Sequence, residues 1–174
     1  MRKLRLALVV LVAGFALAQA VPVERTNPPV ESEVQAPPAA MAALRKACWD
    51  CHSNETVWPW YASVAPMSWV VARDVNGGRG ALNFSRWNAI DAKRLEKLAR
   101  EIAEEVQDGD MPPLLYTLAH PSQKPADADK AAIVAWARTL GGAAGASRDP
   151  ARPAPPPSAP ARPDDEREEH EHRR

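Results

Sequence analysis

The only two cysteines of the chain lie three positions apart, and a histidine directly follows the second. Cys48, Cys51 and His52 form the pattern C-x-x-C-H, which is typical of covalent attachment of a c-type haem. On a helix this spacing brings both thiols to one side, where each can form a thioether, and the adjacent imidazole turns toward the iron as its proximal ligand. We therefore expect one covalently bound haem c.

Three other chemistries use the same residues and stay open as alternatives. A redox disulfide of thioredoxin type needs Cys48 and Cys51 after a strand, at a helix N-terminus, whereas here they lie late in a predicted helix. Zinc needs four ligands, and neighbouring Cys51 and His52 rarely fit one tetrahedron, which leaves His120 as a further candidate. A purely structural disulfide is the third alternative.

Met111 is the candidate ligand for the distal side of a haem iron. It follows a predicted helix end, and Pro112 and Pro113 hold the chain extended after it. A thioether on a stiff loop suits a cytochrome ligated by histidine and methionine. The rival ligands are His120, which would give bis-histidine ligation, and Met67 within a predicted helix. The structural alternative is that Met111 packs under its loop and does not bind the iron.

Four segments with helical periodicity must position these residues, and no segment alternates like a strand. The predicted helices cover residues 41–52, 65–78, 91–109 and 127–142. Gly77 and Gly141 are interpreted as the ends of the second and fourth, and Asp127 or Asp129 lies near the start of the fourth. The fold class is therefore all-α, a small helical domain of the cytochrome c type.

The helix over 91–109 has the clearest pattern. Its apolar residues recur at helical period, Glu96 faces Arg100 one turn on, and Gly109 ends it. Elsewhere the apolar residues are small, and tryptophan replaces the expected Leu, Ile and Phe. A domain of this composition suits packing around a cofactor, although a small core filled by tryptophan is the simpler interpretation. The tryptophans are Trp49, Trp58, Trp60, Trp69, Trp87 and Trp136.

The N-terminal residues 1–20 predict export. Three basic residues precede an uncharged apolar run, and Ala18 and Ala20 have the form of a signal-peptidase site. A retained anchor is the alternative, because the uncharged stretch from Leu6 to Val23 approaches the length of a membrane span. The basic start keeps the N-terminus in the cytoplasm. We expect a periplasmic protein, or one on the outer face of the cytoplasmic membrane.

The remaining boundaries follow from composition. Residues 21–40 are rich in proline and predict an extended spacer, residues 41–145 hold the haem-binding domain, and residues 146–174 predict a disordered tail that is rich in proline and then in charge. His170 and His172 in this tail are interpreted as solvated polymer. The net charge is zero, which excludes a basic field for nucleic acid.

Three stretches resemble a known family. "CWDCHSNETVWPWYASVAPMSWVVARDV", "GRGALNFSRW" and "GDMPPLLYTLAHP" are similar to the bacterial haem-binding domain family, a cytochrome-c-like group of exported or membrane-tethered proteins. "VERTNPPV" resembles the lead-in after the membrane segment of such proteins. The resemblance covers about Val23 to Leu140. One departure is Ala126, where such proteins tend to place a serine or threonine cap.

The resemblance implies a site. Cys48 and Cys51 attach haem, His52 is the proximal ligand and Met111 the sixth. "WPWY" and "GRGALNFSRW" then belong to the haem surroundings, so that Trp58 and Trp60 pack on the macrocycle. Arg79 pairs with a propionate, with a solvated loop arginine as the plain alternative.

These residues predict a single-electron carrier rather than a catalyst, because two protein ligands leave no open position on iron. Its redox partner proteins are unknown. A haem-based ligand sensor or peroxidase-like domain with a displaceable sixth ligand is the alternative. A periplasmic scaffold without haem is a third hypothesis, and it would be colourless.

Overall fold

The fold is all-α, as predicted. The computed structural model describes the backbone of residues 1–146 and the side chains of residues 1–141. Within these residues there are seven α-helices and three short 3-10 helices but no strand, and the single isolated β-bridge joins Ser32 to Arg86. Most of the predicted disordered tail, including His170 and His172, lies outside the described residues.

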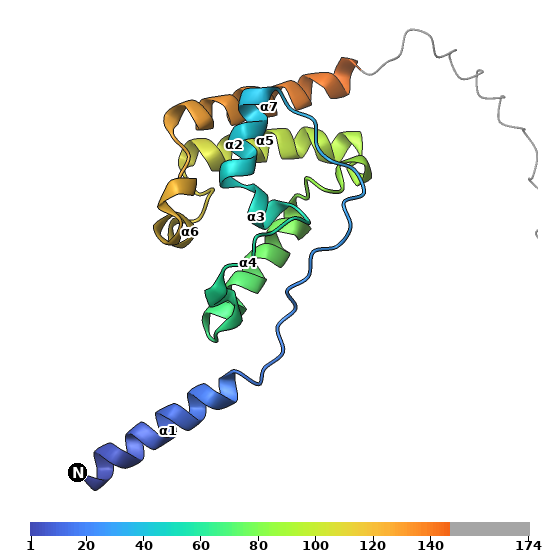
Figure 1. Cartoon of the computed structure of the whole chain (residues 1–174). Coiled ribbons are helices and arrows are strands. Elements are labelled where there is room, and N and C mark those ends of the chain that lie inside the picture. The colour runs from blue at the N-terminus through green and yellow to red at the C-terminus, as the bar shows by residue number, and fades with distance from the viewer. Residues whose placement is uncertain (147–174) are drawn as a thin grey trace, which may run out of the picture.

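Two long helices form the most regular part of the domain. α5 (Ala92–Asp108) and α7 (Asp127–Ala146) lie antiparallel, and α2 (Pro38–Ala47) packs against α7 (Figure 1). We call α5 and α7 the helix pair. Their buried side chains form one apolar core with α2, which includes Leu44, Leu98, Val106, Ile133, Val134 and Ala137.

Both ends of α5 follow from local sequence. The Asp91 carboxylate accepts a hydrogen bond of 2.8 Å from the Arg94 N–H and caps the first turn. Gly109 ends the helix in the left-handed conformation, with φ of 83°, which glycine adopts without steric cost. The predicted Glu96–Arg100 pair is present, with 2.9 Å between Oε1 and Nη1.

The start of α7 uses a carboxylate in place of a hydroxyl cap. Asp129 Oδ2 accepts a hydrogen bond of 2.9 Å from the Ala126 N–H and forms an ion pair of 2.8 Å with Lys46 of α2. The helix begins at Asp127, so the departure from the family pattern at Ala126 does not move its start. Hydrogen bonding to Lys46 and to the Ala126 N–H lowers the pKa of Asp129.

Two glycines do not end helices as predicted. α4 (Met67–Ala81) continues past Gly77, and α7 continues past Gly141 to Ala146. A glycine in a helix interior costs about 1 kcal/mol relative to alanine, and tertiary packing along both helices exceeds this cost. α7 stays against α5 at Gly141, where an added Cβ would lie 3.7 Å from the Ala99 Cβ.

The predicted helix over residues 41–52 is present but interrupted. α2 ends at Ala47, Cys48 has φ of −119°, and the four-residue helix α3 (Trp49–His52) follows. The Cys48 N–H still donates to the Leu44 carbonyl at 2.9 Å, and the Cys48 carbonyl accepts from the His52 N–H at 3.0 Å. Cys48 therefore lies at the bend itself and Cys51 in the short helix after it, rather than both on one continuous helix.

The extended segment before α2 packs closely on the domain. Val34 is fully buried in the core, and its N–H donates to the Phe84 carbonyl at 2.9 Å. α2 begins at Pro38, before the predicted domain boundary at residue 41. The N-terminal helix α1 (Arg2–Ala18) projects from the domain (Figure 1) and has no buried residue. Among the described helices, none combines the length and the apolar character needed to cross a bilayer.

Candidate functional site

The C-x-x-C-H residues face a set of connected cavities below the helix pair. Cys48, His52 and Met111 line two neighbouring cavities, and Cys51 lines the first of these and a third. The walls of the cavity shared by both cysteines are largely apolar and come from α3, α4 and the loop after α5. We call α3, α4 and α6 (Leu114–Ala119), with the connecting residues 53–66 and 109–113, the site lobe.

One nitrogen of His52 is held by the backbone. His52 Nδ1 lies 3.0 Å from the Leu82 carbonyl oxygen, and a carbonyl only accepts, so Nδ1 carries the proton and Nε2 is left with its lone pair. Burial lowers the pKa of His52. The imidazole is therefore neutral near pH 7, which is the form that ligates a metal.

Both thiols are free and protonated at neutral pH. The two cysteines form no disulfide. Burial, and then the neighbouring Cys51, raises the pKa of Cys48 to about 12. Burial, followed by the charges of Asp50 and Asp74, raises the pKa of Cys51 to about 11. A thioredoxin-type site has a lowered thiol pKa instead, so this environment does not favour redox chemistry of a dithiol.

Gly78 lets α4 approach the cysteine helix. A Cβ built on Gly78 would lie 2.5 Å from the Cys51 carbonyl oxygen and 3.2 Å from the Cys51 Cβ. Any residue other than glycine would therefore push α4 away from α3. This role could not be predicted from the sequence, where Gly77 was interpreted as a helix end and Gly78 carried no separate signal. Only the packing of two helices makes the second glycine necessary.

Met111 lies in the short loop between α5 and α6. Its N–H donates to the Glu105 carbonyl at 3.1 Å, and its side chain lines the same two cavities as Cys48 and His52, with 37% of the residue exposed. The rival Met67 lines the cavity next to Cys51, together with His120. Of the three candidate distal ligands, only Met111 shares a cavity with His52 in the described lining residues.

Arg79 lies in a polar network and does not line the three cavities at the cysteines. Its guanidinium donates four hydrogen bonds of 2.7–2.9 Å to the lead-in segment and to the loop after His52. The acceptors are Ser53 O, Thr26 O, Asn27 Oδ1 and Thr56 Oγ1. These four bonds use most of the five N–H donors of the guanidinium, and the pairing of Arg79 with a propionate stays a prediction.

The two tryptophans predicted to surround a haem lie away from the described cavity walls. Trp60 is 80% exposed and packs edge-on against Tyr61. Trp58 donates from Nε1 to Asn27 Oδ1 at 3.2 Å. Tyrosines take their place at the cavity, since Tyr61 and Tyr116 line it. Within "WPWY" it is therefore the tyrosine that lines this cavity, and the packing of Trp58 and Trp60 on a haem stays a prediction.

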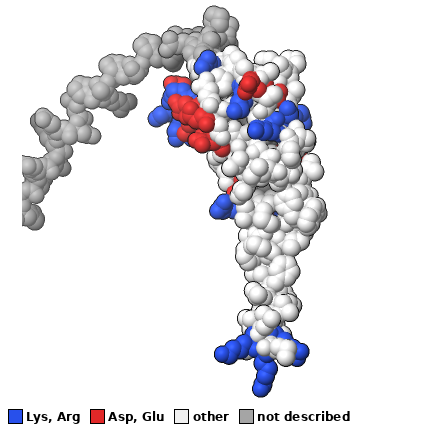
Figure 2. Space-filling model, turned by 90° about the vertical axis from the view of Figure 1, so that its left-hand side faces the viewer, with Lys and Arg blue, Asp and Glu red and all other residues white. Residues whose placement is uncertain are grey.

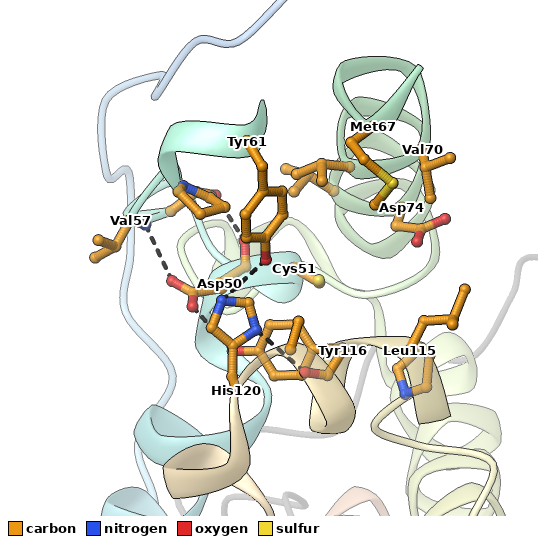
Figure 3. Close-up of a pocket in the computed structure, with 16 residues that line it drawn as sticks. Asp50, Cys51, Val57, Tyr61, Met67, Val70, Asp74, Leu115, Tyr116 and His120 are labelled. Carbon is orange, nitrogen blue, oxygen red and sulfur yellow. Dashed lines mark hydrogen bonds between the residues drawn. The ribbon is translucent and has the colours of Figure 1, made fainter. Parts of the chain in front are cut away.

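A chain of hydrogen bonds closes one side of this cavity (Figure 3). His120 Nδ1 lies 3.1 Å from the Tyr116 carbonyl, so Nε2 accepts from the Tyr61 hydroxyl at 3.0 Å. The Tyr116 hydroxyl lies 2.9 Å from Asp50 Oδ2 and 2.6 Å from Gln123 Oε1. Burial, followed by the Asp50 charge, raises the pKa of both tyrosines. Asp50 thus links α6 to α3, the helix that contains Cys51.

A comparison with known families now bears on these cavities. The model of the haem-binding domain family matches residues 13–139, which is well over half of the chain. The chain belongs to the haem-binding domain family. The match contains α2 to α6 and most of α7, and with them every residue placed at the cavities above. No curated protein and no solved structure matches the chain.

The residues of this haem-binding domain fit the cofactor. An uncharged His52 with a free Nε2, two free thiols and a methionine sulfur border largely apolar cavities, and these are the donor types that haem iron and its side chains take up. The cavities also account for the sparse core noted in the sequence. The domain leaves space beside α3 that its own side chains do not fill.

Proposed function

We propose that this haem-binding domain is a c-type cytochrome that transfers single electrons. Cys48 and Cys51 hold the haem through thioether bonds, and His52 and Met111 are its axial ligands. One observation carries the proposal: His52 and Met111 line the same cavities, while the Leu82 carbonyl holds the His52 Nδ1 proton and leaves Nε2 for the iron.

Each residue has a defined task in this proposal. When bound, the haem supplies a one-electron iron couple. The Leu82 carbonyl fixes the ring plane and tautomer of His52. Gly78 keeps α4 against Cys51, so that the attachment helix stays in place. The apolar walls exclude water and, with a methionine ligand, raise the reduction potential. Two protein ligands leave no position for a substrate, which favours a carrier over a catalyst.

A second candidate function has one observation in its favour. Met111 is 37% exposed and lies on a loop of five residues between α5 and α6, so its sulfur is easier to displace than a buried ligand. A haem-based ligand sensor or peroxidase-like domain needs such a position. His120 is the only other histidine near the cavities among the described residues, and its Nε2 accepts from Tyr61.

We further propose that the protein works outside the cytoplasmic membrane. Residues 1–20 have the basic start and apolar run of an export segment, and covalent haem attachment takes place after export. Proteins that accept the electron are expected in the same compartment.

Optical spectra of the holoprotein test the axial ligands. We expect a reduced c-type spectrum for the wild type, which does not change on addition of carbon monoxide. Met111→Ala should open the sixth position, bind carbon monoxide when reduced and lower the potential. His120→Ala is the matched variant and should keep the wild-type spectrum. An unchanged Met111→Ala spectrum with an altered His120→Ala spectrum contradicts the assignment, and carbon monoxide binding by the wild type favours the sensor.

A further inference from the structure

Several large apolar side chains are exposed on η1 (Trp60–Ser63), on α6 and in the loop before η1, and two of them line the cavity between α4 and α6. Trp60 is 80% exposed, and Leu114, Leu115 and Leu118 of α6 are 72%, 70% and 66% exposed. Val57, with 76% exposure, and Leu115 line the same cavity. Clusters of this kind mark interaction surfaces. We call these five residues the apolar face.

The apolar face lies in a part of the surface with few charges. Figure 2 looks onto the side of the molecule where α6 lies and shows the charged side chains gathered toward the helix pair. Below them a broad uncharged area continues to α1, whose far end carries basic side chains (Figure 2). A partner with complementary charge therefore has little to bind here.

Hydrogen bonds join the residues that follow α1 to the segment that follows Trp60. Gln19, directly after α1, accepts a hydrogen bond of 2.9 Å from the Ala65 N–H, and its amide nitrogen lies 3.5 Å from the Ala65 carbonyl. Arg25 donates to the Ala62 carbonyl at 2.9 Å and also bonds Ser63. Residues 62–65 adjoin Trp60, so the end of α1 is fixed beside the apolar face.

α1 itself needs an apolar environment. Its seventeen residues have no buried side chain, and most of them are aliphatic. At a rise of 1.5 Å per residue the helix reaches about 25 Å, which is less than a hydrocarbon core of about 30 Å. The helix is short, and Gln19 directly after it is hydrogen-bonded to the domain. The domain is therefore held against the lipid surface, with no spacer between the two.

We propose that the apolar face rests on the surface of a lipid bilayer, on the same side from which α1 enters the lipid. In Figure 1 α1 leaves toward the side of the domain that carries η1 (Trp60–Ser63) and α6. Tryptophan and leucine are suited to the surface region of a bilayer, because an indole prefers the boundary between headgroups and acyl chains. The inference rests on the proposed export and on retention of residues 1–20.

Two alternative occupants are less well supported. A second copy of the chain would leave the apolar α1 uncovered, whereas lipid covers α1 and the adjoining face together. A protein partner would need its own apolar patch, and nothing in the described residues supplies charge to orient it. A lipid bilayer therefore covers both exposed apolar surfaces, α1 and the apolar face.

Hydroxyl-radical footprinting of the full-length holoprotein in nanodiscs tests the proposal. The discs contain phosphatidylcholine and phosphatidylglycerol, with one chain per disc. Trp60 is the most exposed tryptophan of the described residues, and Trp87 is half-buried near α5. We expect Trp60 to be oxidised more slowly than Trp87, the reverse of the order that their exposure gives in water. Faster oxidation of Trp60 than of Trp87 overturns the proposal.

Matched charge variants provide the second measurement. Leu114→Glu/Leu118→Glu places two carboxylates on exposed positions of α6, one turn apart, and should lower partition into vesicles of the same two lipids about tenfold. Ala131→Glu/Ala135→Glu adds the same two charges on exposed positions of α7 and should leave partition unchanged. Equal partition of both variants overturns the proposal.

Three controls separate the causes of failure. Protection of Trp60 that rises with the number of chains per disc assigns the face to a second copy and overturns the proposal. An intact mass that lacks residues 1–20 also overturns it, because Gln19 is then absent. A colourless sample contradicts the proposed cytochrome function instead, and the position of Trp60 in the disc is measured independently of the haem.

Discussion

The helix pair and the site lobe are stabilised in different ways. In the helix pair, side chains such as Leu98 and Ile133 interlock in an apolar core, and its surface carries ion pairs one helical turn apart. In the site lobe the helices are short, and polar side chains such as Asp50 and Arg79 connect segments far apart in sequence. Its centre is a set of cavities.

This difference separates folding from function. The helix pair buries its apolar side chains in one continuous core, to which α2 and Val34 also contribute. The site lobe leaves space for a cofactor and compensates with hydrogen bonds that hold α3, α4 and α6 around it. Changes in the site lobe should therefore alter haem binding and stability together, whereas surface changes in the helix pair should alter stability slightly and haem binding not at all.

Gly78→Ala should have the largest effect. The new Cβ would lie 2.5 Å from the Cys51 carbonyl oxygen, so α4 must move, and we expect a loss of roughly 3 kcal/mol or more in unfolding free energy together with reduced haem content. Urea denaturation and the haem-to-protein absorbance ratio measure both.

Gly80→Ala is the control for this variant. Gly80 lies in the same helix, is exposed and lines none of the cavities at the cysteines. An added Cβ at Gly80 meets nothing within 4 Å, so the change should stabilise the helix by about 0.5–1 kcal/mol. If both variants behave alike, close packing of α4 on α3 is not the cause.

Arg79→Ala should rank second. It removes hydrogen bonds that join residues 26–27, 53 and 56, and we expect a cost of about 2–3 kcal/mol, because hydrogen bonds from a charged group are stronger than neutral ones and this group is partly exposed. Hydrogen exchange should show faster exchange in the lead-in segment, while α5 keeps its protection. Uniform acceleration over the whole domain would mean that the two regions are not independent.

Tyr116→Phe should show a pH-dependent effect. Burial, and then Asp50, raises the pKa of Tyr116, so the folded chain keeps the phenol proton to higher pH than the unfolded chain, whose pKa is about 10. The wild type should exceed the variant by about 1–2 kcal/mol at pH 8, and this difference should shrink as the pH rises above about 10. A difference that is constant from pH 8 to 11 would refute the proposed contact.

Glu96→Gln should have the smallest effect. Its partner Arg100 lies one turn on, and both side chains are more than half exposed, so the pair contributes about 0.3–0.5 kcal/mol. The effect should vanish in 1 M salt, and haem content should match the wild type. A loss of haem would break the division between the helix pair and the site lobe.

The sequence predicted the helix pair better than the site lobe, for a physical reason. Apolar periodicity, the Asp91 cap and Gly109 are local signals, and α5 agrees with all of them. The C-x-x-C-H pattern is also local, and it led to the family that the comparison confirms. The position of Met111 after a helix end and before a proline pair is also a local signal, and its role as an iron ligand stays a prediction.

The missed features depend on contacts between distant segments. Gly78 received no role from the sequence, because its role depends on Cys51 in another helix. The hydrogen bonds of Arg79 were not predicted either, because the sequence does not show that Thr26 and Ser53 come within its reach. Val34 was placed in a spacer, since one apolar residue among prolines carries no periodicity, yet it is fully buried.

The intact mass of the exported protein tests the central claim most directly. Covalent attachment at Cys48 and Cys51 predicts a mass above that of the polypeptide by one haem, retained in denaturant, and a return to the bare polypeptide mass in Cys48→Ser/Cys51→Ser. A wild-type mass equal to the polypeptide alone, with both thiols open to alkylation, would contradict the account.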